Sequence, residues 1–281
     1  MVPDATRLPG TTVAGTGPEV MLDIRHVQKI YEGRDRSVEA VRDLDFRVAA
    51  GELVCVVGPS GAGKTTLLRC IAGLLEVTKG EILLSNQKVT GPPEGMAVVF
   101  QEYGRSLFPW MTVRQNVELP LREKGVDRSE RARLVDEALE AVGLAHVHRA
   151  HPWQLSGGMQ QRVAIARAVA YEPRVLLMDE PFAAVDAQTR AELEDLILRL
   201  WQRLNVTIVF VTHDIDESVY LGQRVIVLSN SPTVVLDDVK IDLPGERDQV
   251  TTRSRPEFSR LRTRIYQLVQ LAKQQNATAR A

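Results

Sequence analysis

The residues best suited to chemistry form a glycine-containing loop at positions 58–66, with the sequence GPSGAGKTT. The loop fits the pattern G-x-x-x-x-G-K-[ST], in which backbone N–H groups converge on phosphate oxygens. Lys64 would reach the β- and γ-phosphates of a nucleotide, and the Thr65 hydroxyl would reach Mg²⁺. The alternative is a glycine-rich turn that binds nothing. The predicted phosphate-binding residues are Gly58, Pro59, Ser60, Gly61, Ala62, Gly63, Lys64, Thr65 and Thr66.

Two carboxylates follow a second short apolar segment, VLLM at positions 175–178. This segment lies between Pro173 and Pro181 and is typical of a central strand in a parallel sheet. Unpaired carboxylates at the end of a buried strand are costly, so they favour a nearby cation or a reacting water. We expect Asp179 to hold Mg²⁺ and Glu180 to orient or deprotonate the attacking water. A solvated acidic loop is the alternative.

A second glycine loop, LSGGMQQR, lies at positions 155–162. Taken alone, its Ser156 is an N-cap for a helix predicted over residues 159–171, followed by two flexible glycines. Together the three motifs resemble the ATP-binding subunit of an ABC transporter, and LSGGMQQR matches the signature motif of that family. The resemblance implies that Ser156, Gly157 and Gly158 contact ATP held by the phosphate loop of a partner. That partner is a second copy of the chain or a paralogous cassette, in a head-to-tail dimer.

Four further positions match the family residue by residue. Tyr31 is expected to stack on adenine, although a tyrosine at a strand end more often packs against other side chains. Gln101 is expected to contact Mg²⁺ and water, and His213 to bond the γ-phosphate; without the resemblance both would be taken as structural or surface residues. Asp186 matches the D-loop aspartate, which acts across the dimer. The resemblance thus implies Glu180, His213 and Gln101 as catalytic residues, and as metal ligands Thr65, Gln101 and Asp179.

Two segments depart from the family pattern. Residues 183–186 are AAVD where the family commonly has SALD or GALD, so a polar or flexible first position is lost and the aspartate is kept. We expect function to be retained. Residues 222–225 are GQRV where the family often has ADRV, so Gln223 replaces a carboxylate. The sequence alone does not indicate what this exchange does.

The elements that must position these residues alternate in type along the chain. A helical stretch is predicted at residues 65–75, directly after the phosphate loop. Helical periodicity covers residues 128–142, with Asp127 as N-cap and Gly143 as the stop, and again residues 188–204. Short apolar segments predict strands at 53–57, 97–100, 175–178, 207–212 and 225–228. The fold class is therefore α/β, a P-loop NTPase core with a mainly parallel sheet. The resemblance adds an antiparallel β subdomain and a helical signature subdomain, which together make an ABC ATPase cassette.

We divide the chain into three parts. Residues 1–19 are rich in Thr, Gly and Pro and lack an apolar core, which predicts a loose tail rather than a signal peptide. Residues 20–243 form the ATP-binding domain, with the helical subdomain at about 102–173. Residues 244–281 are a C-terminal extension in which an amphipathic helix follows Pro256. Its apolar stripe is expected to pack on the core or on a second subunit.

The composition indicates a globular protein. The 281 residues are 44% hydrophobic and 25% charged with a net charge of −1, which argues against a broad nucleic-acid surface. Cys55 and Cys70 are expected as separate thiols, as in a reducing cytoplasm. No segment approaches the ~20 apolar residues that span a bilayer. Three histidines lack a metal-binding spacing and are expected in a loop: His146, His148 and His151.

The segment that begins at Gln101 resembles one branch of the family. The sequences QEYGRSLFPW at 101–110, MDEPF at 178–182 and DAQTR at 186–190 resemble importers of nitrate, sulfonate and taurine. This resemblance covers about residues 20–236. It implies two membrane permease subunits, an extracytoplasmic solute-binding protein, and a peripheral position on the cytoplasmic face of the membrane.

Residues 103–110 are the predicted docking face for the permease, since an apolar and aromatic loop is suited to an interface core. The ATPase of an exporter or of a lipoprotein-release system is an alternative, and a non-transport ABC ATPase is another. The solute stays open among nitrate, sulfonates, taurine and pyrimidine-like precursors.

Overall fold

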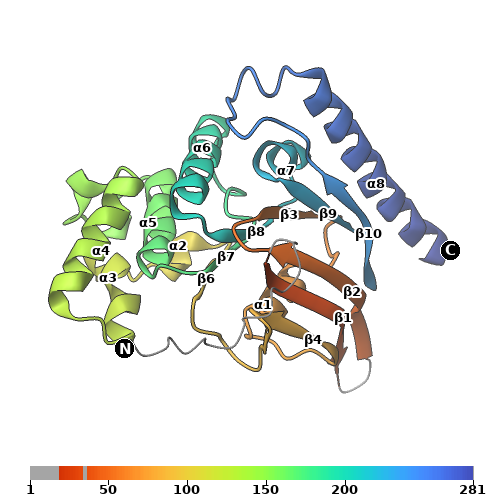
Figure 1. Cartoon of the computed structure of the whole chain (residues 1–281), viewed down its shortest axis with the longest axis horizontal. Coiled ribbons are helices and arrows are strands. Elements are labelled where there is room, and N and C mark those ends of the chain that lie inside the picture. Colours follow the sequence, from red (N-terminus) through yellow and green to blue (C-terminus); the bar gives the residue numbers. More distant parts are fainter. Residues whose placement is uncertain (1–18, 34–36, 281) are drawn as a thin grey trace, which may run out of the picture.

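A computed structural model describes residues 19–33 and 37–280, except for the side chains at 103, 105 and 275–280 (Figure 1). Residues 1–18 of the predicted tail lie outside the described residues. In the described part, ten strands form one sheet in the order β5-β4-β1-β2-β10-β9-β3-β8-β7-β6. The strands are β1 (Val20–Glu32), β2 (Ser37–Ala49), β3 (Leu53–Val57), β4 (Lys79–Leu84), β5 (Gln87–Lys88), β6 (Met96–Val99), β7 (Val175–Asp179), β8 (Thr207–Val211), β9 (Arg224–Leu228) and β10 (Thr233–Lys240).

Five neighbouring strands, β9, β3, β8, β7 and β6, run parallel. Strands β3, β7 and β8 are buried at every position, which explains their continuous apolar sequences. Because these strands are parallel, their carboxyl ends meet at one edge of the sheet. The segments that follow Val57, Val99, Asp179 and Val211 therefore begin close together, and they carry most of the predicted site residues.

The other strands form an antiparallel part. Strand β1 pairs with β2 and β4, and β4 pairs with β5. Strand β10 joins the two parts, because it pairs antiparallel with β9 and, through Thr233 and Val234, parallel with β2. The predicted combination of a mainly parallel core with an antiparallel β subdomain is confirmed.

Helices cover both faces of the parallel strands. In β3, Leu53, Cys55 and Val57 pack into a cluster with α5 and α6, while Val54 and Val56 pack into a second cluster with α1. This alternation follows from the two-residue period of a strand. The helices are α1 (Lys64–Ile71), α2 (Tyr103–Ser106), α3 (Val113–Glu123), α4 (Arg128–Ala141), α5 (Gly157–Ala170), α6 (Ala187–Leu204), α7 (Ile215–Leu221) and α8 (Pro256–Arg280), with short 3-10 turns at Ala145–Val147 and Pro152–Gln154.

Helices α2 to α5 form a lobe at the β6 side of the sheet (Figure 1). The loop before α3 is held by Asn116, which is fully buried. Its side-chain amide donates to the carbonyls of Phe108, Met111 and Thr112, and its oxygen accepts the N–H of Phe108 at 2.8 Å. The predicted N-cap of α4, Asp127, accepts the backbone N–H of Ser129. The loop before α3 and the N-terminus of α4 therefore both have hydrogen-bond partners for their polar groups.

Two predicted helix boundaries differ from the structure. The helix expected over 65–75 ends at Ile71, because Gly73 turns the chain in the left-handed region at φ 66°. The signature helix begins at Gly157 rather than at Met159, because the Ser156 side chain accepts the N–H of Met159 at 3.3 Å and so caps two residues earlier.

The predicted amphipathic helix after Pro256 is α8, which lies against α7, β9 and β10 (Figure 1). Its residues Phe258, Ile265 and Ala272 are buried there. The stripe thus packs on the core of its own chain. The division of the chain into domains stays a prediction. Among the residues described, no helix combines the length and the apolar composition needed to cross a bilayer.

Candidate functional site

The phosphate loop joins the end of β3 to the start of α1. Gly61 and Gly63 adopt left-handed φ values of 80° and 69°, which glycine adopts without strain. Gly63 stands at the N-cap position of α1 and supplies no side-chain cap, so the first N–H groups of the helix remain for an anion. Lys64 is buried and turns back over the loop, where its Nζ donates to the carbonyls of Gly58 at 3.0 Å and Pro59 at 3.2 Å.

A hydroxyl and a carboxylate face each other beside this loop. Thr65 Oγ1 donates to Oδ1 of Asp179, the last residue of β7, at 3.3 Å. Burial raises the pKa of the Asp179 carboxyl, the Thr65 hydrogen bond opposes this rise, and the neighbouring Glu180 adds to it. Oxygen ligands of this kind fit Mg²⁺, which is bound by one or two protein groups together with water and phosphate oxygens. The donor set therefore suits a magnesium–nucleotide complex.

Glu180 lies at the centre of the predicted catalytic group. Its Oε2 lies 3.0 Å from Nδ1 of His213 and accepts from Nε2 of Gln101 at 3.5 Å. Its Oε1 lies 3.5 Å from Nζ of Lys64. The Glu180 backbone has φ 43°, an unfavourable value for a residue with a Cβ, and its N–H donates to the carbonyl of Val211 at 2.8 Å. The fold therefore brings the three predicted catalytic residues together, because Gln101 and His213 both contact the Glu180 carboxylate.

Tyr31 lies near the end of β1 and reaches the same loop. Its hydroxyl lies 3.1 Å from Oγ1 of Thr66, and its ring is 40% exposed. The Nζ of Lys29 lies 5.5 Å from the centre of the ring. An exposed ring next to the phosphate loop is available to stack on a base.

The signature residues are not part of this cluster. Within the described residues, Ser156, Gly157 and Gly158 make no hydrogen bond to the phosphate loop. Gly158 instead lies against the first turn of α6, where a Cβ would come within 2.5 Å of Cγ2 of Thr189. Asp186 caps α6 and accepts from the N–H of Thr189 at 3.0 Å and from its hydroxyl at 2.7 Å; these hydrogen bonds lower the pKa of Asp186. One chain thus presents two separate groups of predicted nucleotide-binding residues.

A family model described as ABC transporter matches residues 41–183. The chain belongs to the ABC transporter family. It is 45% identical to the nitrate import ATP-binding protein NrtD of Synechocystis over 88% of this chain and 94% of that protein. It is 40% identical to the taurine import ATP-binding protein TauB of Roseobacter denitrificans, over 83% and 87% of the two chains. It is 39% identical to the aliphatic sulfonates import ATP-binding protein SsuB of Bacillus cereus, over 88% and 94%.

A solved structure supports the same assignment. The dimeric, post-hydrolysis structure of the ATP-binding cassette MJ0796, bound to ADP and Pi, is 34% identical in sequence and has a TM-score of 0.70. The matched region covers 79% of this chain and 99% of the MJ0796 chain. The fold is therefore an ABC ATPase cassette, and the protein is an ATP-hydrolysing subunit of the ABC transporter family.

The family departure at Gln223 has a structural partner. The Gln223 side-chain oxygen accepts the backbone N–H of Leu53 at 3.2 Å, and the backbone N–H of Gln223 donates to the Leu53 carbonyl at 2.9 Å. The next residue, Arg224, pairs with Glu52 at 2.9 Å and Asp238 at 2.7 Å. Gln223 thus fastens the start of β3, at the sheet edge opposite to the site. An amide oxygen can accept this hydrogen bond in place of a carboxylate oxygen.

The predicted docking loop exposes one large aromatic side chain. Trp110 is 70% exposed, and its ring centre lies 5.4 Å from that of half-buried Phe108. The side chains of Tyr103 and Arg105 in this loop lie outside the described residues. Trp153, which no sequence pattern singled out, is 71% exposed. The two tryptophan segments are joined by the hydrogen bond from the N–H of residue 113 to the carbonyl of residue 150, a pairing no local pattern would reveal.

Proposed function

We propose that this chain energises the uptake of a small solute of the nitrate, sulfonate or taurine type by binding and hydrolysing ATP. The observation that carries the site assignment is the Glu180 carboxylate, which Gln101 and His213 hold at the carboxyl edge of the sheet beside Lys64. The names of three similar proteins, all ATP-binding proteins of import systems, support the choice of uptake over export. The solute itself depends on other subunits.

In this proposal the triphosphate lies over the loop of residues 58–66, with Lys64 on the β- and γ-phosphates and Tyr31 under the base. Glu180 accepts a proton from a water molecule while the oxygen of that water attacks the γ-phosphorus. The bond from that phosphorus to the β,γ-bridging oxygen breaks, so ADP and Pi result. His213 orients Glu180 and contacts the γ-phosphate. Mg²⁺ held by Thr65 and Asp179, with Gln101 near it, would supply charge neutralisation on the phosphates.

We propose further that a second copy completes each site. The N-terminus of α5, with Ser156, Gly157 and Gly158, would donate N–H groups to the γ-phosphate of ATP on the partner. The separation of these residues from the phosphate loop within one chain supports this arrangement. A dimer is also the form of the cassette MJ0796 bound to ADP and Pi. ATP would then close the dimer, and hydrolysis would release it.

The membrane partner proposed here is a pair of permease subunits, served by an extracytoplasmic solute-binding protein. Trp110 and Trp153 lie exposed on the lobe of α2 to α5 and offer aromatic anchors for such a partner. The lobe is connected to the site by Gln101, which stands between β6 and α2. The protein would therefore act as a peripheral subunit on the cytoplasmic face of the membrane.

A Glu180→Gln variant tests the catalytic assignment. The amide keeps the shape of the side chain but accepts no proton, so we expect ATP binding and ATP-dependent dimerisation with hydrolysis lowered by about 100-fold or more. Initial rates of phosphate release and light scattering measure the two effects. Glu94→Gln, at an exposed carboxylate, is the matched control. Hydrolysis at the normal rate in Glu180→Gln would remove Glu180 from the proposed mechanism.

A further inference from the structure

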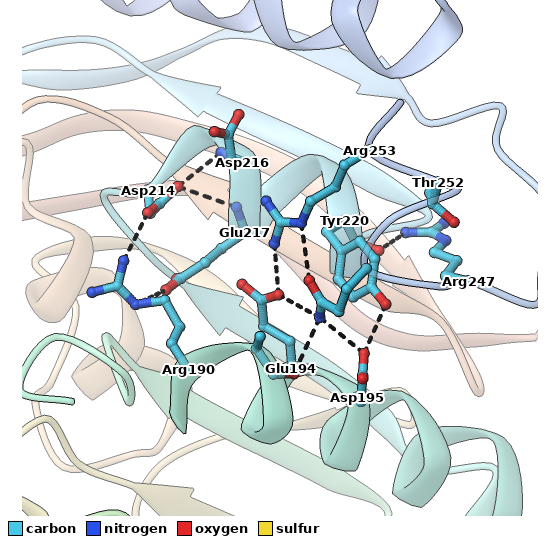
Figure 2. A network of polar contacts seen from close by, with 12 residues as sticks. Arg190, Glu194, Asp195, Asp214, Asp216, Glu217, Tyr220, Arg247, Thr252 and Arg253 are labelled. Atoms are coloured by element: carbon cyan, nitrogen blue, oxygen red, sulfur yellow. Dashed lines mark hydrogen bonds and ion pairs between the residues drawn. The ribbon is translucent and has the colours of Figure 1, made fainter. Parts of the chain in front are cut away.

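Five carboxylates gather behind the site, where α6 meets α7 (Figure 2). Two of them, Glu194 on α6 and Glu217 on α7, are only 1% and 4% exposed. Burial disfavours the charged form of both side chains and so raises the pKa of each, and nearby cations oppose this rise. The remaining members of this acidic cluster are Asp195, Asp214 and Asp216.

One compensating guanidinium comes from α6 itself. Arg190 Nη1 donates to Oδ2 of Asp214 at 3.2 Å, and its Nε lies 3.4 Å from Oε1 of Glu217. Asp214 caps α7, and its N–H donates to the hydroxyl of Thr212, which in turn donates to Glu217 at 2.6 Å. These bonds enclose the backbone on both sides of residue 213. The direction of the His213 side chain is therefore set by how α7 is seated.

The other compensating groups come from the C-terminal extension. Arg253 Nη2 lies 2.7 Å from Oε2 of Glu194, and its guanidinium lies 4.9 Å from the centre of the Tyr220 ring on α7. Gln249 Nε2 donates to Glu194 at 3.0 Å and to Asp195 at 2.9 Å, and Asp195 accepts the hydroxyl of Tyr220 at 2.7 Å. The segment that carries Arg253 and Gln249 thus joins α6 to α7. Figure 2 shows Arg253 directed toward Glu194.

The extension also holds both ends of α7. At its first turn, Arg262 on α8 lies 2.6 Å from Oδ1 of Asp216. At its last turn, Arg247 donates to the carbonyls of Val219 at 3.2 Å, of Tyr220, and of Gly222 at 2.8 Å. These carbonyls lie at the C-terminal end of α7, where carbonyl groups have no N–H partner within the helix. A helix of seven residues tied at both ends and at its middle has little freedom to tilt.

We propose that the C-terminal extension is a positioning element for hydrolysis, and that Arg253 is its central positioning residue. By clamping α7 onto α6, Arg253 holds the segment 212–214 so that the His213 ring points at Glu180. The extension therefore sets the turnover rate without touching the nucleotide. This inference rests on the proposed role of His213 in hydrolysis.

Arg253→Met in the full-length chain tests the proposal, with Arg255→Met as control because Arg255 is exposed and no contact of its side chain is part of the cluster. We expect kcat for ATP to fall about tenfold while KM stays within about twofold, because misplacing a catalytic group acts on turnover. Arg253→Lys keeps the charge and should recover part of the loss. An unchanged kcat in Arg253→Met, or a loss equal to that of Arg255→Met, overturns the proposal.

A double-variant cycle with His213→Ala separates positioning from general stability. If Arg253 acts through His213, Arg253→Met has no further effect on single-turnover hydrolysis in the His213→Ala background. An equal loss in both backgrounds overturns the inference while leaving the proposed function intact. Wild-type hydrolysis by His213→Ala itself would instead contradict the proposed function. Should Arg253→Met fail to fold because Glu194 loses its partner, Arg253→Met with Glu194→Gln removes both charges and is held to the same outcomes.

Discussion

At the scale of single residues, Glu180 shows how the site is prepared for its chemistry. Its backbone has a left-handed φ of 43°, which is unfavourable for a residue with a Cβ. The end of a strand does not require this conformation. The hydrogen bond from its N–H to Val211 maintains this conformation, and the conformation directs the carboxylate toward Gln101 and His213. The position of this carboxylate is therefore fixed by contacts within the protein itself.

Glu217 gives a prediction on the pH dependence of stability. Burial raises its pKa from 4.5 to about 7, although Thr212 and Arg190 favour the charged form and Asp214 and Glu194 oppose it. Between these two pH values the folded protein holds a proton that the unfolded chain has lost, so this group's contribution to stability falls as the pH rises toward 7. Above pH 7 this contribution of Glu217 to the free energy of unfolding, at most about 3 kcal/mol, is fully lost.

Glu217→Gln should therefore flatten the decrease in stability between pH 5 and pH 8, because the amide does not titrate. The thermal unfolding midpoint of the variant, relative to wild type, is expected to be higher at pH 8 than at pH 5 by several degrees. Only the pH dependence is predicted, since the amide also weakens the pair with Arg190. Glu192→Gln at an exposed position is the control. Parallel pH curves for Glu217→Gln and wild type would rule out the raised pKa.

At the scale of elements, the parallel strands were predictable because each is short and apolar, and the central strands β3, β7 and β8 are buried on both faces. Their shared carboxyl edge then placed Lys64, Glu180 and His213 together. The contact between Gly158 and Thr189 and the cluster around Arg253 were not predictable. They join residues far apart in the chain, such as Arg253 and Glu194, and no local periodicity encodes which distant charges meet. Gln223 is a similar case, since its partner Leu53 lies 170 positions away.

The junction of the signature helix with α6 gives a second prediction. A Cβ on residue 158 would come within 2.5 Å of Cγ2 of Thr189, so Gly158→Ala must displace the Thr189 side chain or the first turn of α6 and disturb its hydrogen bonds to Asp186. We expect the ATPase rate to fall about tenfold. Thr189→Ser removes Cγ2 but keeps the hydroxyl that donates to Asp186. Adding Thr189→Ser to Gly158→Ala should therefore restore most of the rate.

Steady-state ATPase rates of the single and double variants measure this relief. Gly91→Ala is the control, because a Cβ there meets nothing within 4 Å and its φ is ordinary. Failure of Thr189→Ser to recover any activity would show that the methyl group of Gly158→Ala acts elsewhere, for example on the nucleotide of a partner.

At the scale of the whole molecule, the proposed function gives the chain two halves of a nucleotide site rather than one whole site. The phosphate loop opens between β3 and α1, whereas the signature residues begin α5 on the helical lobe (Figure 1). The C-terminal extension packs on the other part of the molecule, where α8 contacts α7, β9 and β10. A rotation of one chain against a second copy would be needed to bring unlike halves together.

Mixing two inactive variants tests this arrangement. Lys64→Ala removes the phosphate contact, and Ser156→Asp keeps the N-cap of α5 while placing a negative charge against the γ-phosphate of the partner's ATP. Each variant alone is expected to be inactive. In an equal mixture half of the dimers are mixed, and each mixed dimer holds one intact site out of two. If the two sites work independently, the mixture should recover about a quarter of the wild-type ATPase rate. Full activity of Ser156→Asp alone, or a mixture no faster than its components at concentrations where wild type dimerises, would contradict a site shared between two chains.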